Sequence, residues 1–373
     1  MYFSYLTILA VAFSELASAA PTKLNGTHFS VPQISKGSSS SAHTQLSNAK
    51  GSVAATPEAY DMTYLSPVTI GGQTFNLNFD TGSADLWVYS NLQSQTQQSG
   101  HTIYNASRTG KVMNGQTFAI TYGDGSSATG KVYADKVTVG GVTATSQAVE
   151  AATSVSDFLL EDPDLDGILG LAFSNVNQVK PSQQKTFFDS VKSSLASKLF
   201  TVTLKKGAAG SYDFGYIDNT KYTGKITYTS VNSGSGLWQF GVTGYSLGSG
   251  KTASKSFQAI ADTATTLLYL PDDVVAAYYA QVKGAQFSST QGAWVFPCSA
   301  TLPSFSAVIG GAKATVPGSY LNYAPLDGTT CFGGIQSDSG IGFSIFGSMF
   351  LKSQFVVFDQ TKSNPRLGFA QQK

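Results

Sequence analysis

Charged side chains and histidines are scarce in this sequence. Aspartate, glutamate, lysine and arginine make up 12% of the 373 residues, which is half of the roughly 25% typical of soluble domains. The formal net charge is +1, so we expect no nucleic-acid or membrane-surface partner. Of the three histidines, His28 and His43 lie near the amino terminus, and we expect His101 to be solvated in a polar loop. Ser-His-Asp catalysis, Cys-His catalysis and histidine zinc sites are therefore unsupported.

Cysteine is equally scarce, because Cys298 and Cys331 are the only two. Two thiols are too few for a cysteine zinc site. In an oxidising compartment they are expected to form a disulfide, and two separate buried thiols are the alternative. No glycine-rich loop ending in Lys-Ser or Lys-Thr is present to hold a phosphate. We predict no metal and no cofactor, so any enzymatic chemistry must come from carboxylates.

The first fifty residues have the composition of segments that are removed after synthesis. An apolar run over residues 1–13 precedes Ala17-Ser18-Ala19, a small-residue cleavage pattern that predicts a signal peptide over residues 1–19. A membrane anchor is the alternative, but the run is shorter than the ~20 residues needed to span a bilayer. Residues 20–50 are polar and serine-rich, which is typical of a propeptide. We expect a secreted, extracellular protein.

From Tyr64 onward the sequence predicts an all-β fold. Short apolar alternations such as 68–70, 75–79 and 136–139 are broken by Gly, Asn, Asp and Ser, as in half-buried strands joined by hairpins. Helical spacing predicts two helices, over 184–195 and 271–283. Asn105 begins an Asn-Ala-Ser sequence and is a candidate glycosylation site.

An internal repeat is the strongest organisational signal. Residues 79–83, Phe-Asp-Thr-Gly-Ser, return as residues 261–265, Ala-Asp-Thr-Ala-Thr. An apolar-apolar-Gly triplet follows each copy, at 168–170 and 345–347. The same two features in the same order predict two similar lobes, which we place at 51–225 and 226–373.

The repeated Asp-Thr motif indicates chemistry by a pair of carboxylates. An apolar strand delivers each Asp to the surface of its lobe, where Gly82 lets backbone amides approach the carboxylate closely. Ser83 and Thr265 are placed to donate hydrogen bonds to Asp80 and Asp262 respectively. Like charges this close cannot both ionise easily, so one proton is shared over a wide acid range. One carboxyl can then take a proton from water while the other polarises a carbonyl group.

From residue 51 to the end, the sequence resembles the pepsin family of aspartic proteases, and most closely its fungal penicillopepsin and aspergillopepsin branch. The resemblance is carried by residues 80–87, 122–127, 166–173 and 345–354. It implies a bilobal all-β fold of two pseudo-symmetric, barrel-like lobes with a catalytic cleft between them. It also implies a secreted, monomeric zymogen that becomes an aspartic endopeptidase active at acidic pH. Protein or peptide substrates and pepstatin-type inhibitors are the expected partners.

The resemblance also assigns roles to individual residues. Thr81 and Thr263 match threonines that bond across to the opposite catalytic loop. The stretch Tyr122-Gly123-Asp124 matches the tip of a flap hairpin, and Trp87 matches a tryptophan that hydrogen-bonds the flap tyrosine. Four further residues match positions that bind substrate: Phe158, Ile168, Ala264 and Thr266. Plain core packing remains the alternative for Trp87, Phe158 and Ile168.

Two departures from the family pattern leave alternatives open. Ala264 stands where the family repeats glycine, and the methyl group strains the loop only if its φ is positive. A peptide-binding protein that cleaves poorly is therefore one alternative. Apart from these departures, a glycosidase is a second alternative, because it also needs paired carboxylates. The leader is short, and Lys36 is our candidate for the lysine that family propeptides thread into the cleft.

Specificity and activation form one further hypothesis. Apolar pockets should favour large hydrophobic residues on both sides of the cut, and Asp124 could pair with a lysine on the acyl side. Because the leader ends at Lys50-Gly51, the enzyme could cut itself there in acid, guided by Asp124. The alternatives are that Asp124 only solvates a turn and that processing uses another protease or a nearby apolar site.

Overall fold

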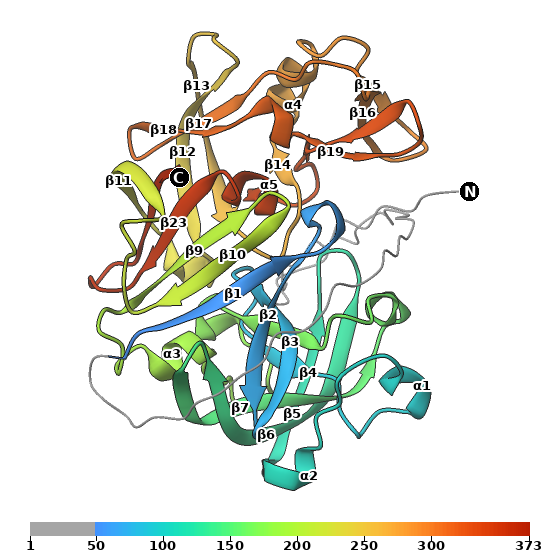
Figure 1. The fold of residues 1–373 in the computed structure, drawn as a ribbon, viewed down its shortest axis with the longest axis vertical. Coiled ribbons are helices and arrows are strands. Elements are labelled where there is room, and N and C mark those ends of the chain that lie inside the picture. Colours follow the sequence, from blue (N-terminus) through green and yellow to red (C-terminus); the bar gives the residue numbers. More distant parts are fainter. Residues whose placement is uncertain (1–48) are drawn as a thin grey trace.

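The computed structural model describes residues 49–373, and it is built almost entirely of β-strands (Figure 1). The expected signal peptide 1–19, nearly all of the expected propeptide 20–50, and Lys36 lie outside the described residues. The alternations at 68–70, 75–79 and 136–139 all lie in strands. The all-β expectation is therefore confirmed.

The strands form three sheets. The largest contains, in spatial order, β11 (Tyr222–Ser230), β24 (Arg366–Gln372), β23 (Gln354–Asp359), β9 (Leu199–Lys205), β10 (Ala208–Phe214), β1 (Gly51–Pro57), β2 (Tyr64–Ile70), β3 (Gln73–Asp80), β8 (Gly167–Gly170), β4 (Leu86–Val88), β7 (Val142–Val155), β6 (Ser127–Val139) and β5 (Lys111–Thr121). The second contains β18 (Ala312–Val316), β17 (Phe305–Ile309), β12 (Gln239–Leu247), β13 (Ala253–Ala261), β22 (Ser344–Phe346), β14 (Leu268–Leu270) and β21 (Ile335–Ser337). The third contains β15 (Gln286–Ser288), β16 (Ala293–Pro297), β20 (Thr330–Gly333) and β19 (Asn322–Pro325).

The internal repeat appears as the same strand arrangement in both halves. In the first, β3 runs parallel to β8, β4 runs antiparallel to β8, and β4 runs parallel to β7. In the second, β13 runs parallel to β22, β14 runs antiparallel to β22, and β14 runs parallel to β21. Each apolar-apolar-Gly triplet therefore lies beside the strand that leads to an Asp-Thr motif. The expectation of two similar halves is confirmed at the level of strand pairing.

Strands from both ends of the chain join the two halves. β1 pairs with β10, β10 with β9, and β9 with β23 near the carboxyl terminus. Figure 1 shows the blue β1 beside the green β9 and β10, with the red β23 next to β9. This shared sheet crosses the boundary expected near residue 225, and the division at that residue stays a prediction.

Helices are short and few in the described part of the chain. The α-helices are α1 (Gln95–Gln98), α2 (Ala106–Thr109), α3 (Phe187–Val191), α4 (Asp272–Tyr279) and α5 (Ser348–Leu351). The 3₁₀ turns are η1 (Ala59–Asp61), η2 (Asp157–Glu161), η3 (Ser174–Val176), η4 (Ser233–Ser235) and η5 (Gly318–Tyr320). Both expected helices exist but are shorter than predicted. Thr186 caps α3 by accepting a hydrogen bond from the Asp189 amide at 3.1 Å, which fixes its late start.

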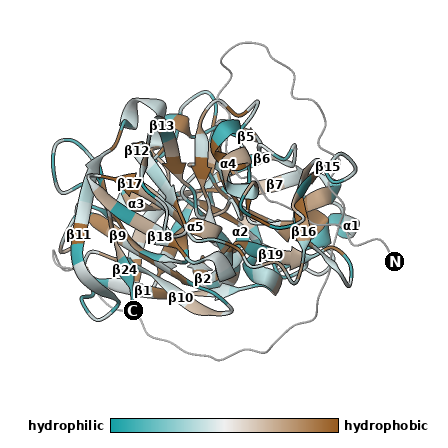
Figure 2. Ribbon diagram, turned by 90° about the horizontal axis from the view of Figure 1, so that it is seen from above, coloured by the Kyte–Doolittle hydropathy of each residue, from teal (hydrophilic) through white to brown (hydrophobic). Residues whose placement is uncertain are grey.

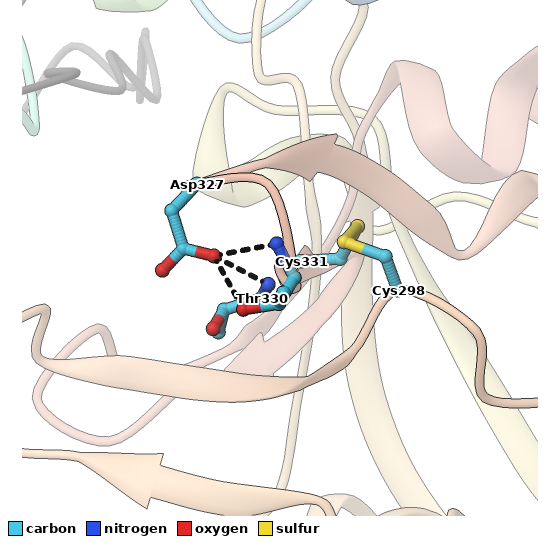
Figure 3. The surroundings of a disulfide bond; sticks show 5 residues. Cys298, Asp327, Thr330 and Cys331 are labelled. Atoms are coloured by element: carbon cyan, nitrogen blue, oxygen red, sulfur yellow. Dashed lines mark hydrogen bonds between the residues drawn. A yellow bond between two sulfur atoms is a disulfide. The ribbon is translucent and has the colours of Figure 1, made fainter.

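The buried side chains of the described residues are mostly hydrophobic, and the ribbon of Figure 2 is brown, the colour of hydrophobic residues, along many strands in the middle of the molecule. Cys298, which follows β16, forms a disulfide with Cys331 on β20, as expected (Figure 3). Asp327 stabilises the adjoining turn by accepting hydrogen bonds from the Thr329 and Thr330 amides, both at 2.7 Å. Among the helices at 49–373, none has the length and apolar character needed to cross a membrane.

Candidate active site

The two repeated aspartates lie together at the ends of equivalent strands. Asp80 is the last residue of β3, and Asp262 directly follows β13. Both residues are 0% exposed, and they lie close enough for the charge of Asp262 to raise the pKa of Asp80. The fold therefore brings the two predicted catalytic residues into one buried pair.

Matching donors hold each carboxylate. Asp80 Oδ1 accepts a hydrogen bond from the Gly82 amide at 2.7 Å, and its Oδ2 accepts one from the Ser83 hydroxyl. Asp262 Oδ1 accepts from the Ala264 amide at 3.1 Å. Its Oδ2 accepts from the Thr265 hydroxyl at 2.6 Å. The hydrogen bonds predicted for Ser83 and Thr265 are both present, and together they fix the direction of each carboxylate plane.

Thr81 and Thr263 lock the two loops to each other. The Thr81 amide donates to Thr263 Oγ1 at 3.1 Å, and the Thr263 amide donates to Thr81 Oγ1 at 3.0 Å. Each hydroxyl then donates to a carbonyl of the opposite strand: Thr81 to Ala261 at 2.8 Å, and Thr263 to Phe79 at 2.5 Å. All four bonds are buried, so they set the relative position of the loops in a site without competing water.

The glycines of the two triplets are required by close backbone contact. A Cβ atom on Gly170 would lie 2.5 Å from the Asp85 amide nitrogen. One on Gly347 would lie 2.3 Å from the Leu267 carbonyl oxygen. Hydrogen bonds from the next residues complete the support, because the Leu171 amide donates to the Asp80 carbonyl and the Ser348 amide to the Thr265 carbonyl.

Burial controls the ionisation of the pair. It is the largest cause that raises the pKa of both Asp80 and Asp262, and the charge of Asp262 raises the pKa of Asp80 further. The Ser83, Thr265 and loop-amide hydrogen bonds act in the opposite direction by stabilising the charged form. The arrangement therefore favours a state in which the two carboxyls hold one proton between them.

The backbone angle φ at Ala264 decides whether its methyl group strains the catalytic loop. Tyr60 and Asp61 are the non-glycine residues with positive φ in the described part of the chain, so Ala264 is not in the left-handed region. Its methyl group belongs to a buried apolar group that we call the flap cluster, which also includes Trp87, Tyr122 and Ile168. Alanine causes no backbone strain at this position, which removes the physical reason for expecting a damaged dyad.

The flap is the hairpin of β5 and β6, turned at residues 122–126. Tyr122 begins the turn, with its amide donating to the Ser126 carbonyl at 2.8 Å. The Trp87 Nε1 donates to the Tyr122 hydroxyl at 2.7 Å, so the expected hydrogen bond is present. Tyr122 is buried, and its pKa is raised by burial and then by the charge of Asp80. The flap tyrosine therefore lies close to the aspartate pair.

Asp124 follows at the tip of the flap with one oxygen unpaired. Its Oδ1 accepts a hydrogen bond from the Ser126 amide at 2.8 Å. Its Oδ2 is buried and has no hydrogen-bond partner. Burial raises the pKa of this carboxyl above its ordinary value. The side chain thus stabilises its turn and also keeps an acceptor free.

The remaining predicted residues are placed differently from one another. Phe158 on η2 is half-buried at the edge of the flap cluster. Ile168 is 2% exposed and packs inside that cluster, which is the core alternative that the sequence left open. Thr266 is buried and donates to the Met62 carbonyl at 2.7 Å. Asn105 is exposed at the start of α2.

One expectation is wrong. His101 is 9% exposed rather than solvated. Its ring stacks on Tyr89 with centroids 3.7 Å apart, and its Nδ1 lies 2.8 Å from the Leu165 carbonyl oxygen. Burial lowers its pKa, which favours the neutral ring. The polar sequence around it gave no sign of this packing, because Leu165 is 64 residues away.

Two buried polar clusters beside the site were missed by the sequence reasoning. Lys352, which directly follows α5, forms an ion pair with Asp61 at 2.8 Å, which connects the two halves. Asp85 and Glu150 form a carboxyl pair behind the first catalytic loop. The sequence did carry a signal for each cluster. Glu150 is an acidic residue within an apolar strand, and Lys352 is a lysine within an apolar stretch.

Three carboxylates elsewhere could in principle hold a cation. Oxygens of Glu58, Asp162 and Asp164 lie within 4.8 Å of one another. Burial and the charges of both aspartates raise the pKa of Glu58 to about 9, which favours its neutral form and opposes cation binding. The prediction that the protein needs no metal stays a prediction.

Comparison with known proteins identifies the class. The sequence pattern of the family described as eukaryotic aspartyl proteases matches residues 63–372. Aspergillopepsin-1 of Aspergillus fumigatus is 53% identical over 99% of both chains. Penicillopepsin-1 of Penicillium janthinellum is 58% identical over 87% of this chain and 99% of its own. The crystal structure of an aspartic proteinase from Irpex lacteus superposes with a TM-score of 0.72 at 26% identity, covering 87% of this chain and 98% of that one.

The fold and the repeated Asp-Thr loops thus define a pepsin-type aspartic endopeptidase, a hydrolase. The chain belongs to the eukaryotic aspartyl protease family. The resemblance drawn from the sequence is confirmed, and the glycosidase alternative is set aside.

Proposed function

We propose that this enzyme cleaves peptide bonds at acidic pH by activating a water molecule between Asp80 and Asp262. The observation that carries the proposal is the buried carboxyl pair, held by matching donors and by the reciprocal Thr81 and Thr263 hydrogen bonds. One ionised carboxylate takes a proton from the water as it attacks, and the protonated partner polarises the scissile carbonyl. The proton that the carboxylate has taken from water is then available to the leaving amine.

The shared proton explains why acid is required. Because burial raises the pKa of both carboxyls, the singly protonated pair persists over a wide acid range. As pH rises and both groups ionise, the protonated partner disappears and activity falls. As pH drops until both groups are protonated, the base disappears instead. A bell-shaped pH profile on the acid side is therefore expected.

Access to the pair requires movement of the flap. Both aspartates and Tyr122 are buried in this structure, so substrate can reach the dyad only when the hairpin of β5 and β6 opens. Closure over a bound peptide would exclude water from the site and strengthen each polar contact. The Trp87–Tyr122 hydrogen bond gives the closed hairpin a fixed anchor.

Specificity is proposed to follow from the surfaces beside the dyad. The flap cluster is apolar, and the half-buried ring of Phe158 lies at its edge, so large hydrophobic side chains should be preferred on both sides of the cut. The unpaired Oδ2 of Asp124 is available to a lysine ammonium on the acyl side. Such a pair would be stronger than a surface salt bridge because the closing flap removes water from it.

Secretion as a zymogen and release as a monomer complete the proposal. The disulfide between Cys298 and Cys331 suits an oxidising compartment, and the exposed Asn105 is accessible for glycosylation. Cleavage at Lys50-Gly51 remains our hypothesis for activation. Ala49 bonds through its amide and carbonyl to Ser194 and Ala196, and Gly51 pairs with Phe214. The cut must therefore happen while this segment is detached from the sheet.

Digestion of haemoglobin across the acid and neutral range, with and without pepstatin, tests the proposed activity. We expect cleavage that is confined to acid and abolished by pepstatin, with products cut between large hydrophobic residues. Cleavage that persists at neutral pH in the presence of pepstatin would contradict the proposal. Terminal sequencing of the acid-incubated zymogen tests the activation step, and a mature terminus many residues from Gly51 would refute it.

A further inference from the structure

A second pair of carboxyl groups lies behind the first catalytic loop. Asp85 precedes β4 and Glu150 lies on β7, where it stands opposite Trp87 in the strand register. Both residues are almost completely buried, and their carboxyl groups are neighbours because one Asn177 amide nitrogen lies 3.1 Å from an oxygen of each. Neither takes part in the proposed chemistry, so their burial needs another explanation.

Asn177 fixes the arrangement of this pair. Its Oδ1 accepts hydrogen bonds from the amides of Val179 at 3.1 Å and Gln184 at 2.8 Å, which directs its Nδ2 toward the carboxyls. That Nδ2 lies 3.1 Å from both Asp85 Oδ1 and Glu150 Oε1. Because one amide group binds both acids, the three side chains act as a single unit.

Donors to this unit are few: the Leu86 amide lowers the pKa of Glu150 and so stabilises its charged form. Asp85 Oδ1 accepts a further hydrogen bond from the Gln178 amide at 2.8 Å. Asp85 Oδ2 and Glu150 Oε2 are buried and have no partner. A buried oxygen that carries charge without a donor is costly. One proton held by the two carboxyl groups lowers this cost, because it leaves the pair with a single negative charge.

Within residues 49–373, neither acid forms an ion pair with a lysine, arginine or histidine. The titratable group that faces the pair is Tyr122 on the flap, whose own pKa is raised by the charges of both acids. On the neighbouring strand β6, Val132 stands opposite Glu150, while Lys131 points to the other face and is exposed. Lysine, arginine and histidine are absent from the groups that principally shift either pKa in the described structure.

The unit is attached directly to the machinery of the first lobe. Asn177 Nδ2 also donates to the Ala84 carbonyl at 3.2 Å. The Asp85 carbonyl accepts from the Gly170 amide at 2.9 Å. On the other side, Glu150 is paired in register with Trp87, which donates to the flap tyrosine. A disturbance of this unit would therefore reach both the Asp80 loop and the flap.

We propose that Asp85 and Glu150 share one proton and act as positioning residues whose full ionisation releases the catalytic loop, so that this pair sets the upper pH limit of the folded first lobe. In acid the shared proton leaves one negative charge, which Asn177 and the Gln178 amide stabilise. When pH rises, the proton passes to solvent and two uncompensated charges repel each other inside the lobe. The proposal rests on the proposed function only in treating residues 80–83 as catalytic.

The directions of the pKa shifts agree with a loss of stability as pH rises. Burial, the largest cause, raises the pKa of both carboxyls, and the charge of Asp85 raises the pKa of Glu150 further. The unfolded chain releases these protons above about pH 4, whereas the folded chain retains one. The folded state then binds more protons than the unfolded state, so stability falls as pH rises from about 4 through the raised pKa values.

Melting curves of isosteric amide variants test the proposal. Glu150→Gln and Asp85→Asn each remove one ionisation while keeping a side chain of the same shape, and the new amide can donate to the remaining carboxylate. We expect the melting temperature, followed by tryptophan fluorescence from about pH 4 to about pH 8, to begin its fall about one pH unit higher than in the parent. At about pH 4 the variants should melt close to the parent. Glu161→Gln, at an exposed glutamate, is the matched control and should follow the parent.

Each result of the melting experiment either supports or overturns the proposal. A delayed fall in at least one of the two folded variants supports the proposal, and one variant suffices if the other does not fold. An unchanged pH dependence in both, an equal loss of melting temperature at every pH, or failure of both to fold in acid would overturn it. Because melting is measured without substrate, a parent that lacked protease activity would refute the proposed function and leave this test intact.

Discussion

The buried ion pair between Asp61 and Lys352 should be a main contributor to the attachment of the two halves. Lys352 Nζ lies 2.8 Å from Asp61 Oδ2, with side chains 2% and 5% exposed. In Lys352→Met, Asp61 would keep only the hydrogen bond from the Gly207 amide at 2.7 Å. Removing one partner of a buried pair costs about 3–5 kcal/mol. In a chain of this size we expect the melting temperature at neutral pH to fall by roughly 5–10 °C.

Melting of parent and variant at about pH 7 measures the loss in Lys352→Met. The expected fall reflects the cost of leaving the buried Asp61 side chain without its ion-pair partner.

A double variant gives the control. Asp61→Asn combined with Lys352→Met removes both charges, and asparagine tolerates the positive φ of 54° at this position. The double variant should recover most of the stability that Lys352→Met loses at about pH 7. If the double variant is no more stable than Lys352→Met, the reasoning is wrong.

Three further predictions concern single features of the structure. Trp87→Phe removes the hydrogen-bond donor to Tyr122, and this bond is worth about 1 kcal/mol. We therefore expect kcat/KM for peptide cleavage to fall by roughly fivefold to tenfold. An unchanged value would show that the flap does not need this hydrogen bond. Ala264→Gly should leave kcat equal or raise it, because it removes a methyl group without deleting a donor; a large loss would show that the loop is adapted to the methyl. Replacing both Cys298 and Cys331 by serine should destabilise the fold by about 3–4 kcal/mol, since the disulfide closes a loop of 33 residues. Denaturant unfolding measures this loss of free energy of unfolding. A loss below about 1 kcal/mol would contradict the estimate.

The elements that could be predicted from the sequence are those that repeat or that depend on near neighbours. The two Asp-Thr loops occur twice, and each binds its carboxylate through donors two or three residues away. The strands show their alternation locally. The threonine cross-bonds and the Trp87–Tyr122 bond followed from the family resemblance, because each joins residues far apart in the chain.

What the sequence reasoning missed depends on contacts across long separations. Asp61 and Lys352 are 291 residues apart, and neither neighbourhood shows that the other will cover it. His101 lies in a polar segment, but stacking on Tyr89 buries it. The sheet that joins the halves pairs β1 with β10 and β9 with β23, and strand alternation alone does not specify such partners.

Replacing each aspartate of the dyad by asparagine tests the central claim most directly. We would measure kcat for one peptide at acidic pH in Asp80→Asn and Asp262→Asn, alongside circular dichroism to confirm that the fold is retained. Each variant keeps the shape and the hydrogen-bonding loop but loses a group that must exchange a proton with water or carbonyl, so the rate should fall by roughly 10³-fold or more in both. Near-parent activity in either folded variant would contradict a mechanism that depends on the pair.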